Sequence, residues 1–402
     1  AGMLATSPSL LAHASIAGTD ATFACLATLA ALTIGLQLQS PTWLRLVLPG
    51  AATGLAFSAK YTGVLLIPCF LVGRGLDLAR SRRATSGPLP RRITRFALDA
   101  LGFLTVGLLT AWACHGFQID PNQHWRGIPL PTFAASFEHQ MTHNRIGHPS
   151  FYEGARSWSG WWSYYPYTML VKSTLPELAL AAAGVLIALR GLGRRRRGGL
   201  GADRQRATIL WFIAITTAAL TTSPICIGHR YALVLYPMIV LVSVDALAGA
   251  VANVGWLRLL GATLLGGQVA TSLFVTPHYL SYFNPLFGGP ATAWNRLSDS
   301  NIDWGQDLPA LRAILDREGF RAVALDYFGT AAPTDYGIEA DAVDAPRRPL
   351  DEYDALAVSV TQLQSIYRRP GETRRPAPDV YRILRGFSPT FRAGGSIFVY
   401  DL

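Results

Sequence analysis

The chain has 402 residues, of which half are hydrophobic and only 15% are charged. A soluble globular protein of this length needs a larger share of charged surface, so the composition argues against that class. The formal charge of +10 comes largely from two arginine clusters without alternating aromatic residues, and it therefore gives no indication of nucleic-acid binding.

Long apolar segments predict a polytopic α-helical membrane bundle. A spanning helix needs about 20 apolar residues, whereas a buried helix of a soluble protein has apolar runs of about 10 to 14 residues flanked by charge. Residues 3–17 are apolar but short, and we expect an interfacial helix there. Five nearly uncharged segments have the length of a spanning helix: residues 21–39, 96–114, 208–227, 231–252 and 255–276. Residues 46–73 and 177–192 are two further candidates.

Two arginine clusters orient these helices. They lie just beyond apolar segments, where the positive-inside rule expects cytoplasmic loops. With both clusters inside, residues 115–176 form an outer loop, and residues 46–73 cross twice with Lys60 at the outer tip of a hairpin. Asp20 then lies at the outer surface, and the chain crosses the membrane about eight times, with everything after residue 276 outside. The clusters consist of Arg74, Arg80, Arg82, Arg83, Arg91, Arg92 and Arg95, and of Arg190, Arg194, Arg195, Arg196, Arg197, Arg204 and Arg206.

The chain changes character at about residue 277. Strand-length apolar runs and short helical patterns follow one another there: Leu308–Glu318 and Val380–Leu384 as helices, and Ala322–Phe328, Leu356–Val360 and Ser396–Tyr400 as strands. Strands that alternate with helices predict a small α/β domain. We therefore expect two domains, a transmembrane region over residues 1–276 and an extracytoplasmic α/β domain over residues 277–402.

Charged groups at the outer membrane surface are candidates for function, because a charge at a membrane boundary is costly to place. The two lysines of the chain, Lys60 and Lys172, both map to this surface. A lysine suits a phosphate group, or its side chain extends to the lipid interface. Arg230, in a short outer turn, either clamps a phosphate or anchors a lipid head group. Asp20 either acts as a general base, helps to position a metal or caps the following helix.

The outer loop is rich in histidine and aromatic residues. Its histidines are His139, His143 and His148, and its aromatic run consists of Trp158, Trp161, Trp162, Tyr164, Tyr165 and Tyr167. The histidines are candidate ligands for a divalent metal ion, the only cofactor left open, although their spacing matches no defined zinc pattern. The aromatic run forms either an interfacial belt or a stacking platform for a sugar and an isoprenoid.

Five segments, taken together and in this order, resemble a known family. They read "SPSLLAHASIAGTDATFACLATLAAL", "GLAFSAKYTGVLLIP", "WSGWWSYYPYTMLVKSTLPEL", "IGHRYALVLYP" and "HYLSYFNPLFGGPATAWNRLSDSNIDWGQDLPALRAIL". They are similar to successive motifs of glycosyltransferase family 39, the GT-C-fold relatives of protein O-mannosyltransferases and lipid A aminoarabinose transferases. The last segment is the most specific and resembles the junction into the exported domain of a bacterial subgroup.

This resemblance implies a hexosyl or pentosyl transferase of the bacterial plasma membrane. Such an enzyme takes a sugar from a polyprenyl-phosphate donor and passes it to a glycan, lipid or protein acceptor on the extracytoplasmic face. In the family an acidic residue of the first outer loop is the base that activates the acceptor. That loop precedes the segment at which this chain begins, so we expect an N-terminally truncated chain that lacks the main base and is inactive by itself.

The resemblance also suggests roles for individual residues. Asp20 matches a second acidic position and is expected to support catalysis. Lys60 and Arg230 match basic positions that hold the donor phosphate, and Lys172 is a third candidate. His229 replaces the usual apolar neighbour of that arginine and is included with an open role. The candidates for contacts to the acceptor, sugar or lipid in the outer loop are His143, Trp161, Trp162 and Tyr165.

Two other classes of function compete with this prediction. A transporter or flippase for a lipid-linked anion would also place basic groups inside a helical bundle, but it predicts discontinuous helices and an internal repeat, and the sequence shows neither. A non-catalytic membrane scaffold is the third class. The transferase is favoured because displacing a polyprenyl phosphate requires a cationic cradle for the leaving group and a carboxylate near the acceptor.

Overall fold

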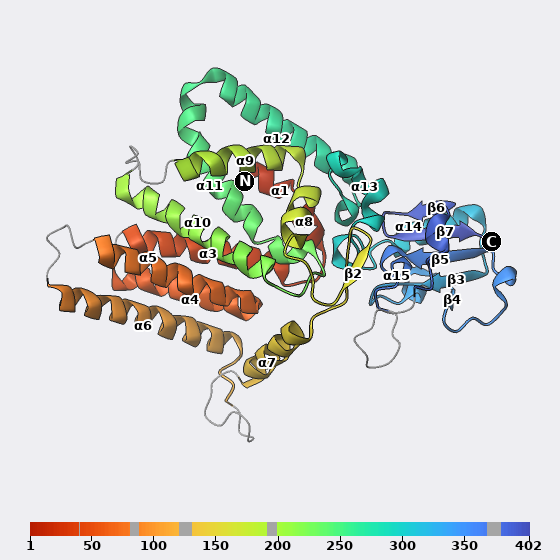
Figure 1. Cartoon of the computed structure of the whole chain (residues 1–402), viewed down its shortest axis with the longest axis horizontal. Helices are drawn as coiled ribbons and strands as arrows, with labels where there is room; N and C mark the ends of the chain where they lie inside the picture. Colours follow the sequence, from red (N-terminus) through yellow and green to blue (C-terminus); the bar gives the residue numbers. More distant parts are fainter. Residues whose placement is uncertain (40, 81–87, 120–130, 191–198, 368–378) are drawn as a thin grey trace. The chain divides into compact units, whose positions relative to one another are not determined.

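The computed structural model describes residues 1–39, 41–80, 88–119, 131–190, 199–367 and 379–402. It is mostly helical and divides into two compact units, which are described separately below (Figure 1). The first unit comprises residues 1–142, 175–220 and 231–270, and the second comprises residues 143–174, 221–230 and 271–402. The second unit thus contains, besides the C-terminal part, two stretches of the predicted membrane region. Arg82, Arg83 and Arg194 to Arg197 lie outside the described residues.

The first unit is built from helices. Their bounds are α1 Gly2–Ala5, α2 Pro8–Ser15, α3 Asp20–Gln39, α4 Trp43–Ala59, η1 Tyr61–Leu65, α5 Leu66–Arg80, α6 Leu89–Cys114, α7 Pro131–Ile146, α9 Leu175–Arg190, α10 Gly199–Thr221, α11 Leu235–Asn253 and α12 Gly255–Val275, of which α7, α10 and α12 end in the second unit. Among the described residues, α3, α6 and α12 are long and apolar enough to cross a membrane. The predicted hairpin is present as α4, η1 and α5, with Lys60 at the turn.

The N-terminal segment forms two short helices instead of the single interfacial helix expected over residues 3–17. Helix α1 ends at Ala5, and α2 begins at Pro8 after the N-cap Ser7. Proline lacks the N–H group that a continuous helix would need at this position but fits the first turn of a new one. The break therefore follows from the Ser7-Pro8 pair.

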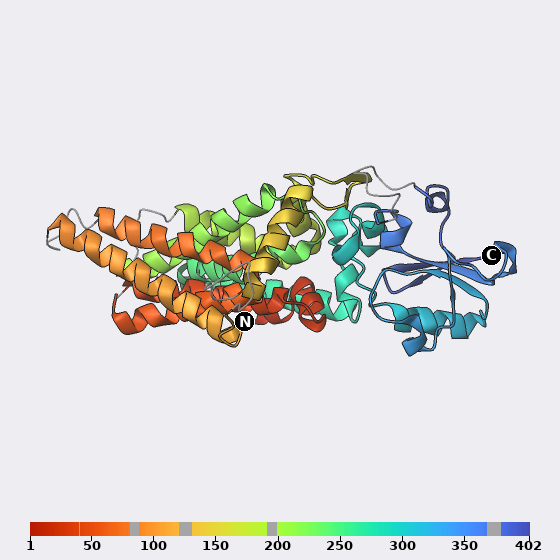
Figure 2. The ribbon, with the colours of Figure 1, turned by 90° about the horizontal axis from the view of Figure 1, so that it is seen from below.

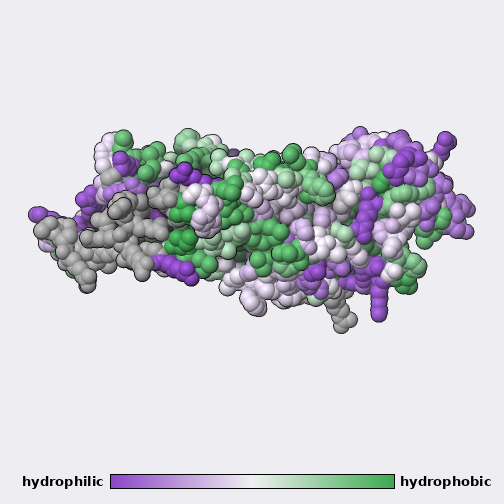
Figure 3. Space-filling model, turned by 90° about the horizontal axis from the view of Figure 1, so that it is seen from above, coloured by the Kyte–Doolittle hydropathy of each residue, from purple (hydrophilic) through white to green (hydrophobic). Residues whose placement is uncertain are grey.

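Helix α4 packs against both α3 and α6. Gly54 allows the close approach to α6, because a Cβ atom at this position would overlap the carbonyl oxygen of Gly107. Large apolar side chains of α4, α6 and α12 remain exposed, for example Leu101 at 63% and Leu259 at 69%. The apolar surface of this helical unit is visible in Figure 3. Such exposure is typical of helices that face lipid and is unfavourable in water.

The second unit contains the sheets. Its helices and strands include β1 Ser150–Tyr152, β2 Ala155–Ser157, α8 Tyr164–Lys172, η3 His229–Ala232 (partly), α13 Gly289–Thr292, η7 Asp299–Asn301, α14 Leu308–Glu318, β3 Val323–Asp326, β4 Asp341–Ala342, β5 Ala355–Ser359, α15 Val360–Leu363, η10 Leu384–Gly386, β6 Phe391–Ala393 and β7 Ile397–Asp401. β1 and β2 form a small antiparallel pair. The five-stranded sheet has the order β4-β3-β5-β7-β6, in which β3 runs parallel to β4 and β5, and β7 runs antiparallel to β5 and β6.

Helix α14 covers one face of this sheet (Figure 2). It has the predicted bounds Leu308–Glu318, and its apolar residues form one core with the strands. The three predicted strands are present as β3, β5 and β7, so the α/β character of this part is confirmed. The helix predicted at Val380–Leu384 was wrong, because these residues form turns that lead into the short 3-10 helix η10.

Candidate functional site

Asp20 and Lys60 form an ion pair in the first unit. Asp20 is the first residue of α3, and Lys60 ends α4 with an extended backbone. Since α3 packs against α4, these two helix ends meet, and the Lys60 ammonium donates a hydrogen bond to Asp20 Oδ1. Only 8% of the Asp20 side chain and 17% of the Lys60 side chain are exposed. The structure thus brings together the predicted supporting carboxylate and one predicted phosphate-binding cation.

An aromatic ring completes this charged cluster. The Lys60 Nζ atom lies 4.2 Å from the centre of the Tyr231 ring, which is a cation–π distance. The tight turn after Lys60 depends on Gly63, because a Cβ atom there would come within 2.6 Å of the Phe57 backbone nitrogen. The turn therefore fixes the backbone position of Lys60, and the contacts with Asp20 and Tyr231 fix the position of its ammonium group.

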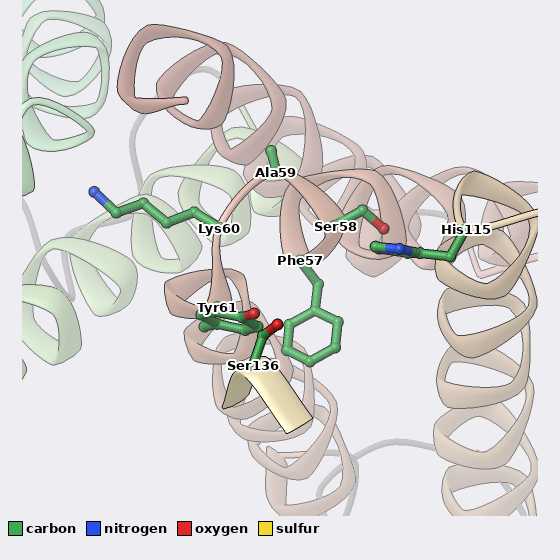
Figure 4. A pocket seen from close by; sticks show the side chains of 7 residues that line it. All are labelled: Phe57, Ser58, Ala59, Lys60, Tyr61, His115 and Ser136. Carbon is green, nitrogen blue, oxygen red and sulfur yellow. The ribbon is translucent and has the colours of Figure 1, made fainter. Parts of the chain in front are cut away.

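A cavity of about 210 Å³ is lined in part by Lys60, whose ammonium points away from the other lining side chains (Figure 4). Its lining residues are Phe57, Ser58, Ala59, Lys60, Tyr61, His115 and Ser136. The imidazole of His115, the C-cap residue of α6, points toward Ser58, whereas Phe57, Tyr61 and Ser136 of α7 lie together. Hydroxyl and imidazole groups both donate and accept hydrogen bonds. The cavity can therefore hold a small polar group such as a sugar or a phosphate.

An apolar cavity of about 260 Å³ lies next to α4 in the same unit. It is lined by Thr53, Gly54, Phe57, Gly63, Val64, Ile67, Phe103, Leu104, Gly107, Leu108 and Ala111. Phe57 lines both cavities. The apolar cavity and the polar cavity thus follow one another along helix α4.

Lys172 is enclosed in the second unit. Its side chain is 1% exposed, and Nζ donates hydrogen bonds to the carbonyl oxygens of Leu280 at 2.6 Å and Asn301 at 2.7 Å. The Phe283 ring centre lies 4.7 Å from the same atom. Burial lowers the pKa of Lys172 to about 7. This geometry favours a structural role for Lys172 over the predicted contact with a donor phosphate.

His229 and Arg230 differ in their surroundings. His229 is fully buried, where its backbone N–H donates to Asn301 Oδ1 at 2.8 Å and its Nδ1 atom lies 3.1 Å from Thr168 Oγ1. Arg230 is partly exposed as a residue although its Nε atom is buried, and its Cζ atom lies 4.5 Å from the centre of the Trp304 ring. His229 therefore fixes the turn, whereas Arg230 is less completely enclosed.

Three buried aspartates of the Ser298–Asp307 segment were not identified from the sequence. Asp299 accepts a hydrogen bond from the Tyr367 hydroxyl, and burial raises the pKa of Asp303 to about 8. Asp307 Oδ2 accepts from both the backbone N–H and the hydroxyl of Ser396, at 3.0 and 2.8 Å. The signal in the sequence is the recurrence of a carboxylate every four residues just before α14, within the most specific of the quoted motifs.

The histidines of the outer loop are spread over several contacts. The rings of His143 and His148 lie 5.1 Å apart, and the His148 ring lies 5.6 Å from that of Tyr367. His139 is exposed on α7. Among the described residues, which include all three histidines, no group of three or more His, Cys, Asp or Glu side chains is placed to hold a metal ion.

Tyr152 connects several rings of the aromatic run: the rings of Tyr164 and Tyr167 lie 5.9 and 5.1 Å from it, and the Tyr165 ring lies 5.1 Å from that of Tyr164. Tyr165 is buried and donates its hydroxyl to the carbonyl oxygen of Ile225 at 2.6 Å. The Trp161 ring lies 5.4 Å from that of Tyr152. Trp162 is 75% exposed. Of these candidates, Trp162 has the surface exposure that a sugar, a lipid or the membrane interface would require.

Of the predicted cations, Lys60 in the first unit and Arg230 in the second are partly exposed, whereas Lys172 is enclosed. Comparisons of the chain with models of protein families, with curated proteins and with solved structures found no match. The likeness to glycosyltransferase family 39 remains a prediction from the sequence motifs.

Proposed function

We propose that the protein is a multi-pass membrane glycosyltransferase that moves a hexose or pentose from a polyprenyl-phosphate donor to an extracytoplasmic acceptor. The observation that carries this proposal is the Asp20–Lys60 ion pair at the end of α4, where Lys60 also contributes to the lining of the polar cavity. A cation and a carboxylate at one end of a membrane bundle are the two groups that this reaction requires.

In the proposed reaction an acceptor oxygen forms a bond to the anomeric carbon of the sugar. The bond between that carbon and the phosphate oxygen breaks, and polyprenyl phosphate leaves with the electron pair. Lys60 stabilises the negative charge that develops on the phosphate. A carboxylate takes the proton of the acceptor, with Asp20 in a supporting role. A single displacement inverts the anomeric configuration, so a product of retained configuration would contradict it.

The paired cavities support a donor that is both lipid and anion. The apolar cavity beside α4 suits a hydrocarbon chain, and the polar cavity at Lys60 suits the phosphate and sugar. Phe57 lines both, so one molecule with an apolar chain and a polar head group is able to contact both spaces.

The proposed topology has about eight crossings in a bacterial plasma membrane. The long apolar helices α3, α6 and α12 support a membrane location. The arginines at the start of α6, such as Arg91 and Arg92, support a cytoplasmic position for that end. The C-terminal α/β part is then extracytoplasmic.

The proposal is tested by sugar transfer from radiolabelled polyprenyl-phosphate sugars in membranes that carry the full-length protein. We expect Lys60→Met to lower the transfer rate by roughly 10²-fold, because one preorganised charge contact to the leaving group is lost. Lys60→Arg should retain part of the rate. Arg91→Ala removes an exposed cation from the opposite end of α6 and is the matched control.

Two outcomes would contradict the proposal. Transfer that proceeds at the wild-type rate in Lys60→Met would leave the lysine as a membrane anchor. Absence of transfer from any donor, together with movement of the lipid across the bilayer that depends on Lys60, would instead identify a flippase. Protein levels in the membrane are compared in every case.

A further inference from the structure

The Ser298–Asp307 segment fixes the backbone turn that carries Arg230. The Ser300 hydroxyl donates to the carbonyl oxygen of Ile227 at 3.0 Å, and Asn301 Oδ1 accepts from the N–H of His229 at 2.8 Å. A side chain at Gly228 would collide with Ser300. The backbone on which Arg230 begins therefore has little freedom to move.

The guanidinium at the other end of the side chain lies over an aromatic ring from the same segment. The Arg230 Cζ atom lies 4.5 Å from the centre of the Trp304 ring. Stacking uses the flat face of a guanidinium, whereas its N–H groups project from the edge, where a phosphate is bound in bidentate fashion. Both residues are partly exposed, in contrast to the enclosed side chains of His229 and Lys172.

Asp299 adds a negative charge to these surroundings. Burial raises its pKa, and the hydrogen bonds from Tyr367 and from the Ser300 N–H, together with the positive charges of Arg230 and His148, oppose this rise. The residue has a φ of +56°, an unfavourable backbone conformation for a residue other than glycine. The segment therefore holds Asp299 within electrostatic reach of Arg230 at a cost in backbone strain.

We propose that Trp304 is a positioning residue that holds the Arg230 guanidinium with its edge toward a phosphate monoester. The proposal rests on the proposed function in one respect, namely that the bound anion is the phosphate of a polyprenyl monophosphate. It gives the Ser298–Asp307 segment a task in ligand binding, which neither its composition nor its place before α14 suggested.

The test measures binding of two radiolabelled lipids to the immobilised full-length protein: a short-chain polyprenyl monophosphate and the uncharged alcohol of the same chain. Trp304→Ala should weaken phosphate binding roughly tenfold, the upper part of the range for a cation–π contact. Binding of the alcohol should not change, and Trp304→Phe should restore most of the phosphate affinity.

The control variant Phe391→Ala breaks another arginine–aromatic stack of the same unit, that of Arg317 with Phe391 at 5.5 Å. It should leave phosphate binding unchanged. The positioning role is overturned if Trp304→Ala binds the phosphate like wild type, if it weakens phosphate and alcohol equally, or if the wild type does not prefer the phosphate. If the phosphate preference depends on Trp304 but no donor supports sugar transfer, the positioning role stands and the proposed function fails.

Discussion

The Lys172 Nζ atom donates a hydrogen bond to the carbonyl oxygen of Asn301, 129 residues further along the chain. The side chain of Asn301 in turn donates to the Tyr164 hydroxyl at 2.8 Å. Tyr164 and Lys172 are the first and last residues of α8. One asparagine therefore connects both ends of α8 to the Ser298–Asp307 segment.

Burial of Lys172 should make the stability of the protein depend on pH. The pKa of this lysine is lowered to about 7 in the folded state, against roughly 10.4 in an unfolded chain. Between these values the unfolded state binds more protons, so the free energy of unfolding rises with pH, by at most about 1.4 kcal/mol per pH unit. Below pH 7 both states carry the proton and this contribution is constant.

Lys172→Met should remove this dependence. Thermal unfolding of the detergent-purified protein from pH 6 to 9 should give a midpoint that rises less in this variant than in wild type. Leu170→Met changes an exposed residue of the same helix and should retain the wild-type rise. An identical rise in Lys172→Met would show that other groups cause the pH dependence.

The approach of α4 to α6 makes a second prediction. A Cβ atom at Gly54 would overlap the backbone of Gly107 and lie 2.8 Å from Thr110 Cβ. Gly54→Ala should therefore destabilise the protein by about 1–3 kcal/mol, the usual cost of overpacking. Gly261→Ala, where no atom lies within 4 Å of the added Cβ, should be neutral or gain up to about 1 kcal/mol in helix propensity. Equal unfolding midpoints for the two variants would contradict the close contact.

Local sequence patterns were sufficient to predict much of the fold. Helix α14 has the predicted bounds, and Pro309 in its first turn and Gly319 directly after its end are strong boundary signals. The turn at Lys60 followed from placing the arginines on both sides of the apolar stretch at the same face of the membrane. At Val380–Leu384 a short helical pattern failed, since so few residues cannot form a stable helix without packing of their own.

The contacts of the candidate site could not be predicted in the same way. Lys60 meets Tyr231, and His229 meets Asn301, only because distant segments fold together. The sequence placed Lys172 at the outer surface with Lys60, whereas Lys172 is enclosed by backbone carbonyl oxygens and Lys60 is partly exposed in an ion pair. The residues next to Lys172 in the sequence do not indicate that the Lys172 ammonium will be buried against the carbonyl oxygen of Asn301.

Asp307 makes a third prediction, for the β6–β7 hairpin. Its Oδ2 atom accepts hydrogen bonds from Gly395 and Ser396 at 2.8 to 3.0 Å. Asp307→Asn removes the charge from these bonds, each worth roughly 1.5–3 kcal/mol when charged. Amide hydrogen exchange over residues 391–401 should become faster. Asp344→Asn, at an exposed position, should leave it unchanged, and unchanged exchange in Asp307→Asn would show that the hairpin is held by its core alone.

The Asp20–Lys60 pair makes the last prediction, which separates its structural effect from its proposed chemistry. Both side chains are largely buried, so removing one leaves the other charge in a poor environment. Asp20→Asn and Lys60→Met should each destabilise the protein, and the double variant should lose less than the sum, with a coupling energy of about 1–3 kcal/mol. Unfolding of the four proteins by SDS measures this cycle. Additive losses would mean that the pair carries no stability of its own. If the double variant regains stability but does not transfer sugar, the loss of activity is not caused by unfolding. That result would support a role of the ion pair in the reaction.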